Sequence, residues 1–177
     1  MRSVVLDPSL WRILLTLLLG VACATDVRAR RIPNALVLVV LGAALLRAVL
    51  AGVGTSATVM PGFATGPGAA AMGALCGLAL WLPLYAVGAF GAGDVKLFAA
   101  AAAWLGPSAV PNATLYAALA GGVLGLAWFG AQRIARLAPM IAPRAHAALQ
   151  PTTTGKSRVP YGVAIAAGVL GVVWGVR

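Results

Sequence analysis

Apolar residues in this chain gather into six runs, separated by short segments rich in Gly, Pro or Arg. Five of the runs approach the roughly 20 residues that a helix needs to cross a bilayer, and the fourth is shorter. The pattern predicts spanning helices at about residues 10–25, 35–51, 69–90, 95–105, 113–132 and 159–176. We therefore expect an all-α polytopic membrane protein with about six transmembrane helices, forming a single domain over residues 1–177.

The composition supports a membrane protein. Hydrophobic residues make up 62% of the chain and charged residues only 9%, whereas soluble domains contain roughly 25% charged residues. The net charge of +10 does not indicate a nucleic-acid partner. The basic residues cluster in a few segments between the apolar runs, as expected of the cytoplasmic loops of a polytopic protein.

The distribution of basic residues predicts the orientation. Arg and Lys lie in or beside the segments that follow the first, third and fifth runs, and are absent from those that follow the second and fourth. The positive-inside rule then places the odd loops in the cytoplasm and both termini outside. Arg47, in the outward half of the second run, goes against this trend without reversing it. Asp26 and Asp94 are consequently expected at the same cytoplasmic face.

Glycines are spaced four residues apart in three of the runs, which would place each pair on one helix face. Such pairs allow helices to approach closely, although an Ala- and Gly-rich composition produces them equally often. The pairs are Gly73 and Gly77, Gly121 and Gly125, and Gly171 and Gly175.

Acidic residues are rare, and their positions matter for that reason. The chain has three, Asp7, Asp26 and Asp94. A carboxylate in or near a spanning segment is costly, so it is a functional-site hypothesis by default. Asp26 closes the first run, and Asp94 follows a Gly-rich turn between the third and fourth runs. Together they would form an aspartyl dyad.

Both aspartates also have simple structural interpretations. Asp94 can cap the N-terminus of the fourth helix, and Asp26 can pair with Arg30 four residues later. Lys96 is read as an interfacial cation that extends toward the lipid headgroups. Cys23 is expected to pack between helices as a small apolar residue; the same holds for Cys76.

Two carboxylates at one site would suit peptide hydrolysis. Carboxylates brought close together cannot both ionise easily, so they share a proton. The ionised member can take a proton from water while the protonated member polarises the scissile carbonyl. We expect no metal and no cofactor, because His146 is the one histidine and the two cysteines form no ligand cluster.

Three segments resemble the conserved blocks of the bacterial type IV prepilin peptidases. Residues 26–34 (Asp-Val-Arg-Ala-Arg-Arg-Ile-Pro-Asn) resemble the first, and residues 91–97 (Gly-Ala-Gly-Asp-Val-Lys-Leu) resemble the GxGD block. Residues 159–162 (Val-Pro-Tyr-Gly) resemble the third. In addition to Asp26 and Asp94, the residues that match these motifs are Ile32, Pro33, Asn34, Gly91, Gly93, Lys96, Pro160, Tyr161 and Gly162.

The resemblance implies an aspartic endopeptidase of the bacterial inner membrane, with Asp26 and Asp94 as its catalytic pair. Members of this family cut a short basic leader from prepilins and pseudopilins at the cytoplasmic face, so these substrates and membrane lipid are the expected partners. Long members add a domain with two Cys-x-x-Cys pairs and an N-methyltransferase activity. The segment from Asp26 to Pro33 is too short for that insert. The chain looks like the short, peptidase-only form found with Flp/Tad-type pili.

Other interpretations stay open at this point. A non-enzymatic scaffold or small transporter of a secretion system would use the aspartates as structural or ion-pathway groups. Presenilin and signal peptide peptidase share GxGD, but carry Pro-Ala-Leu where this chain has Pro160-Tyr161-Gly162. The first run could also be a signal peptide ending at Ala22-Cys23-Ala24, an alternative disfavoured because further apolar runs follow directly.

Overall fold

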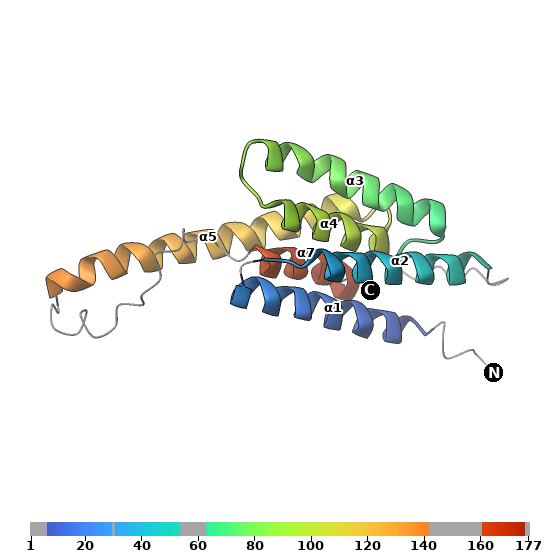
Figure 1. Ribbon diagram of the computed structural model, residues 1–177, viewed down its shortest axis with the longest axis horizontal. Coiled ribbons are helices and arrows are strands. Elements are labelled where there is room, and N and C mark those ends of the chain that lie inside the picture. Colours follow the sequence, from blue (N-terminus) through green and yellow to red (C-terminus); the bar gives the residue numbers. More distant parts are fainter. Residues whose placement is uncertain (1–6, 30, 54–62, 142–160, 176–177) are drawn as a thin grey trace.

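The computed structural model describes residues 7–29, 31–53, 63–141 and 161–175, and this part of the chain is a bundle of helices (Figure 1). The helices are α1 (Pro8–Ala29), α2 (Asn34–Val53), α3 (Pro67–Ala86), α4 (Ala92–Leu105), α5 (Val110–Ile141) and α7 (Gly162–Gly175). Within the described residues, α1, α2, α3 and α5 are long and apolar enough to cross a membrane, and α7 is a shorter apolar helix. The predicted all-α fold of a polytopic membrane protein is confirmed.

The largest difference from the predicted elements is in α5. It begins at Val110 and continues to Ile141, beyond the predicted end at residue 132, because the Ala, Leu and Arg residues of residues 133–141 also favour a helix. In Figure 1 its C-terminal part extends past the other helices, on the left. Val123, Leu126 and Phe129 in the middle of α5 are exposed, as expected of side chains that face lipid.

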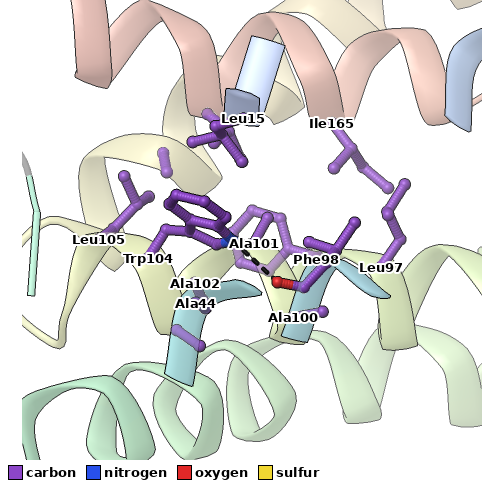
Figure 2. Close-up of a cluster of buried hydrophobic side chains, with 14 of the residues drawn as sticks. Leu15, Ala44, Leu97, Phe98, Ala100, Ala101, Ala102, Trp104, Leu105 and Ile165 are labelled. Carbon is purple, nitrogen blue, oxygen red and sulfur yellow. Dashed lines mark hydrogen bonds between the residues drawn. The ribbon is translucent and has the colours of Figure 1, made fainter. Parts of the chain in front are cut away.

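The short helix α4 forms the centre of the bundle, with α2, α3 and α7 packed around it. Every residue from Ala100 to Leu105 is buried. Figure 2 shows Phe98 and Trp104 of α4 among side chains from neighbouring helices, including Leu15 of α1 and Ile165 of α7. The indole N–H of Trp104 donates to the carbonyl oxygen of Val40 at 3.0 Å. The bundle thus encloses the helix that begins with the GxGD segment.

Two of the predicted glycine contacts join α3 to α4. A Cβ atom on Gly73 would lie 2.4 Å from the carbonyl oxygen of Ala102, and one on Gly77 would lie 2.7 Å from Ala102 Cβ. The second members of the other pairs, Gly125 and Gly175, face open space. The contact between α5 and α7 instead uses Gly168, where a Cβ atom would meet the α5 backbone at 2.5 Å.

Replacing Gly73 by alanine is expected to lower the stability of the bundle. The added methyl group would meet the backbone of α4, which cannot rotate away, and overpacking of this kind costs about 1–3 kcal/mol. The measurement is thermal unfolding of the detergent-solubilised protein. Gly68→Ala in the same helix is the control, because nothing lies within 4 Å of the position that its Cβ would take. An equal melting temperature for both variants would contradict the close α3–α4 contact.

A buried arginine lies toward the opposite end of α4 from Asp94. Arg47 of α2 is 1% exposed, donates to the carbonyl oxygen of Ala64, and lies 5.0 Å from the centroid of the Phe63 ring. Ala64 in turn donates its N–H to the carbonyl oxygen of Trp104 at 2.7 Å. The cation that ran against the predicted orientation is therefore held inside the protein, where it helps to fix the C-terminal end of α4.

Candidate active site

Asp26 lies on the buried face of α1. The buried residues of this helix, Leu15, Leu19, Ala22 and Asp26, follow one another at intervals of three or four and form one stripe. Asp26 is 7% exposed, and its Oδ2 accepts the backbone N–H of Gly162 at 2.7 Å. Gly162 is the first residue of α7, and the first N–H groups of a helix lack partners within it. Asp26 therefore binds the positive end of a neighbouring helix.

Gly162 allows this close approach because it has no side chain. A Cβ atom there would lie 2.9 Å from Asp26 Oδ2 and 3.2 Å from Asp26 Cβ. Cys23, one turn before Asp26, donates its thiol to the carbonyl oxygen of Gly162 at 3.5 Å. Two bonds from α1 thus hold the same residue of α7, and the expected packing role of Cys23 is accompanied by a polar contact at the site.

Asp94 lies in the first turn of α4. The N-cap is Gly91, and Asp94 is the third helical residue, N3; the sequence had suggested Asp94 itself as the cap. Its Oδ2 accepts the backbone N–H of Gly91 at 3.0 Å. A Cβ atom on Gly91 would lie 3.2 Å from that oxygen. Each carboxylate is therefore oriented by a backbone amide at the start of a helix.

The first and second motif segments meet. A Cβ atom on Gly93 would touch Ile32 Cβ at 3.4 Å, so these two residues are neighbours. Lys96 Nζ donates to Asn34 Oδ1 at 3.4 Å on the exposed surface. Pro33 precedes α2, and its carbonyl oxygen accepts the N–H of Leu36 at 3.0 Å. The Ile-Pro-Asn segment thus starts α2 beside the start of α4.

The third segment contacts Asp26 and lies near the charge of Asp94. Tyr161 precedes α7, and its ring meets that of Phe90 edge-on with centroids 4.4 Å apart. Burial raises the pKa of the Tyr161 hydroxyl, and the nearby charge of Asp94 raises it further. The next residue, Gly162, binds Asp26, so this segment contacts one aspartate directly and lies near the charge of the other. Pro160, Arg30 and His146 lie outside the described residues.

An aromatic cluster beside Asp94 was not identified from the sequence. It consists of Trp81, Phe90, Phe98 and Tyr161, which belong to α3, the turn before α4, α4 itself and the turn before α7. Trp81 and Phe98 are stacked with centroids 4.4 Å apart. The sequence spacing could have indicated part of this cluster, because Phe98 follows Asp94 by one helical turn and so lies on the same helix face. Trp81 likewise follows Gly77 by four residues on the face that meets α4.

The arrangement can carry out acid–base chemistry. Two carboxylates lie at the same end of the bundle, where α1 ends and α4 and α7 begin (Figure 1). Among the described residues, no group of three or more His, Cys, Asp or Glu side chains could hold a metal ion. Asp26 and Asp94 are the candidates for acid–base chemistry at this end of the bundle. Exposed Arg28, Arg31 and Lys96 give this end of the bundle a positive surface.

Comparison with known proteins identifies related sequences. The model of the type IV leader peptidase family matches residues 13–126. A prepilin leader peptidase/N-methyltransferase of Pectobacterium carotovorum subsp. carotovorum is 49% identical over 71 residues, covering 36% of this chain and 25% of the relative. One from Dickeya chrysanthemi is 47% identical over 75 residues, covering 38% of this chain and 25% of the relative. The matched region is thus about a quarter of the length of these curated relatives. No solved structure shows significant similarity.

Proposed function

Because this chain belongs to the type IV leader peptidase family, we propose that it is an aspartic endopeptidase that removes the leader peptide of prepilins and pseudopilins, with Asp26 and Asp94 as its catalytic pair. One observation supports this assignment above the others. The two aspartates, 68 positions apart in the sequence, both contact the start of a helix at one end of the bundle. A leader junction presented there would meet both carboxylates.

The proposed reaction uses one ionised and one protonated carboxyl group. The ionised aspartate takes a proton from water, and the water oxygen attacks the scissile carbonyl carbon while the protonated aspartate donates a hydrogen bond to the carbonyl oxygen. The resulting tetrahedral intermediate breaks its C–N bond when the leaving nitrogen receives the proton that the first aspartate took from water. The amides of Gly91 and Gly162 orient the two carboxylates, which supports the proposal because catalysis needs both groups held in a fixed geometry.

We further propose that the dyad faces the cytoplasm from the bacterial inner membrane, in a multi-pass protein with both termini outside. The exposed Arg28, Arg31 and Lys96 near the dyad support this orientation. Their charges suit anionic lipid headgroups at the cytoplasmic leaflet. The scaffold or transporter alternative gives no reason for three separate motif segments to meet at the two aspartates.

The substrate class proposed is the Flp-type prepilin, and no N-methylation of the product is expected. α1 ends at Ala29 and α2 begins at Asn34, which leaves no room between them for a domain with two Cys-x-x-Cys pairs. The curated relatives are named as leader peptidases and N-methyltransferases. This chain would thus perform the first of those two reactions.

Co-expression with a Flp-type prepilin tests the proposal. We expect the pilin to lose its leader, seen as a shift on a gel, and its new N-terminus to be unmethylated by mass spectrometry. The control is the same host with the prepilin alone. An uncleaved pilin in the presence of membrane-inserted protein would contradict the proposed activity. A methylated N-terminus that depends on this protein would contradict the peptidase-only assignment.

A further inference from the structure

The indole N–H of Trp81 is a buried donor without a hydrogen-bond acceptor among the described residues. The side chain is only 2% exposed, so neither solvent nor lipid supplies the acceptor. Native proteins rarely leave such a group unpaired, and each case calls for an explanation. A phenylalanine would fill most of the same space without an unpaired N–H. The indole is therefore poorly explained by packing alone.

Trp81 packs against residues that adjoin the two backbone amides bound by the aspartates. Its ring stacks on Phe98, one turn after Asp94. Its ring centroid lies 4.9 Å from that of Phe90. The next residue, Gly91, donates its backbone N–H to Asp94. The ring centroids of Trp81 and Tyr161 are 6.3 Å apart. The residue after Tyr161, Gly162, donates its backbone N–H to Asp26. The ring that carries the unpaired donor thus packs against residues that adjoin the contacts of both aspartates.

A second tryptophan shows that this bundle can satisfy a buried indole. Trp104 is fully buried, and its N–H donates to Val40 at 3.0 Å. Among the described residues, the other buried side-chain atoms without a partner are Arg12 Nε, Arg47 Nε and Trp128 Nε1. Both arginines lie in the half of the bundle away from the dyad, and Trp128 is only partly buried. Trp81 alone of these combines burial with contact to the site.

We propose that the indole N–H of Trp81 binds a backbone carbonyl oxygen of the peptide substrate, next to the scissile bond. Phe90 and Tyr161, which cover the indole, are only partly buried and would be displaced by the bound peptide. An extended peptide offers one carbonyl acceptor per residue, and a hydrogen bond is stronger in a water-poor interior. The donor is then unpaired in the free enzyme and paired in the complex. This inference rests on the proposed peptidase function.

Trp81→Phe is expected to act in opposite directions on stability and catalysis. Removing an unpaired buried N–H should leave the melting temperature unchanged or raise it, whereas the loss of a substrate bond should lower kcat/KM about tenfold, chiefly through KM. Trp104→Phe is the matched control. It removes a satisfied bond, so its melting temperature should fall, while kcat/KM of the folded protein should stay within about twofold.

Substrate binding can also be observed directly. The Asp26→Asn protein, labelled with ¹⁵N on its tryptophan indoles, is mixed with a synthetic peptide that spans the leader junction of the co-expressed prepilin. The indole signal that is missing in the Trp81→Phe protein should move to higher proton frequency when the peptide is added, as expected for a new hydrogen bond. The Trp104 signal should stay in place.

Several outcomes would overturn the inference. An unchanged KM in Trp81→Phe, or a Trp81 signal that does not respond to the peptide, would show that the N–H does not bind substrate. A shifted pH–rate profile with an unchanged KM would show that the indole acts on the catalytic groups and not on the substrate. A wild-type protein that cleaves no prepilin would overturn the proposed function itself, and the inference with it. Normal cleavage by both wild type and Trp81→Phe would overturn the inference alone.

Discussion

Asparagine in place of either Asp26 or Asp94 is expected to abolish leader cleavage while the helix bundle stays intact. An asparagine oxygen can still accept the N–H of Gly162 or Gly91, so the contacts that orient each side chain are retained. The amide cannot take up or release the proton that the reaction requires. Loss of general acid–base catalysis alone amounts to about 10²–10⁴-fold, and the paired action of the two groups should bring each variant to the upper end of that range.

Asp7→Asn is the matched control for these two variants. Asp7 makes its hydrogen bonds with Ser9 at the start of α1, at the other end of that helix from Asp26. The purified variants would be compared for rate of leader removal and for melting temperature in detergent. We expect full activity in Asp7→Asn and none in the other two, with both dyad variants still folded. Cleavage that persists in purified Asp26→Asn or Asp94→Asn would exclude the aspartyl dyad.

A single methyl group on Gly162 is expected to reduce activity strongly, although less than either asparagine substitution. In Gly162→Ala the new Cβ would lie 2.9 Å from Asp26 Oδ2, closer than van der Waals contact allows, so Asp26 must move. The start of α7 cannot easily yield, because the same residue also accepts a bond from Cys23. A displacement of about 1 Å at a reacting group can cost about 10²-fold in rate. We therefore expect kcat to fall by about that factor.

Gly171→Ala provides the comparison for this substitution. Gly171 lies on the same helix, where a Cβ would touch the Tyr116 ring at 3.4 Å, an ordinary contact. The two variants add the same methyl group to α7, so a difference in kcat between them reports on the contact with Asp26. If Gly162→Ala cleaves prepilin at the wild-type rate, Asp26 does not need its present position for catalysis.

The sequence predicted the helices because their signal is local. Each apolar run corresponds to one helix, and the Gly-rich turn before Asp94 separates α3 from α4 as expected. The C-terminal end of α5 was predicted nine residues early, because arginines at positions 133 and 136 suggested a loop although they also favour a helix. Gly168 was missed because its neighbours on α5 are 51 positions or more away. A spacing rule within one helix cannot detect such a partner.

The residues of the candidate site could also be predicted from the sequence, but their contacts could not. Asp26 and Asp94 stood out because the chain has so few acids, and the motif segments supplied the other candidate residues. Their catalytic roles stay predictions. The bond from Gly162 to Asp26 spans 136 positions, and the position of Trp81 depends on how α3 crosses α4. Both follow from packing between segments distant in sequence, which one sequence does not show.

The enclosure of α4 also bears on how this protein can evolve. Four of the five alanines from Ala99 to Ala103 are buried and the fifth is partly buried, and the glycines of α3 lie against them. A larger residue at one of these positions would require a compensating change on a neighbouring helix. Leucines on the outer faces of α1 and α3, such as Leu17 and Leu75, are well exposed and can be exchanged one at a time. Sequence drift should therefore accumulate on the lipid-facing helices, while α4 changes slowly and in step with its neighbours.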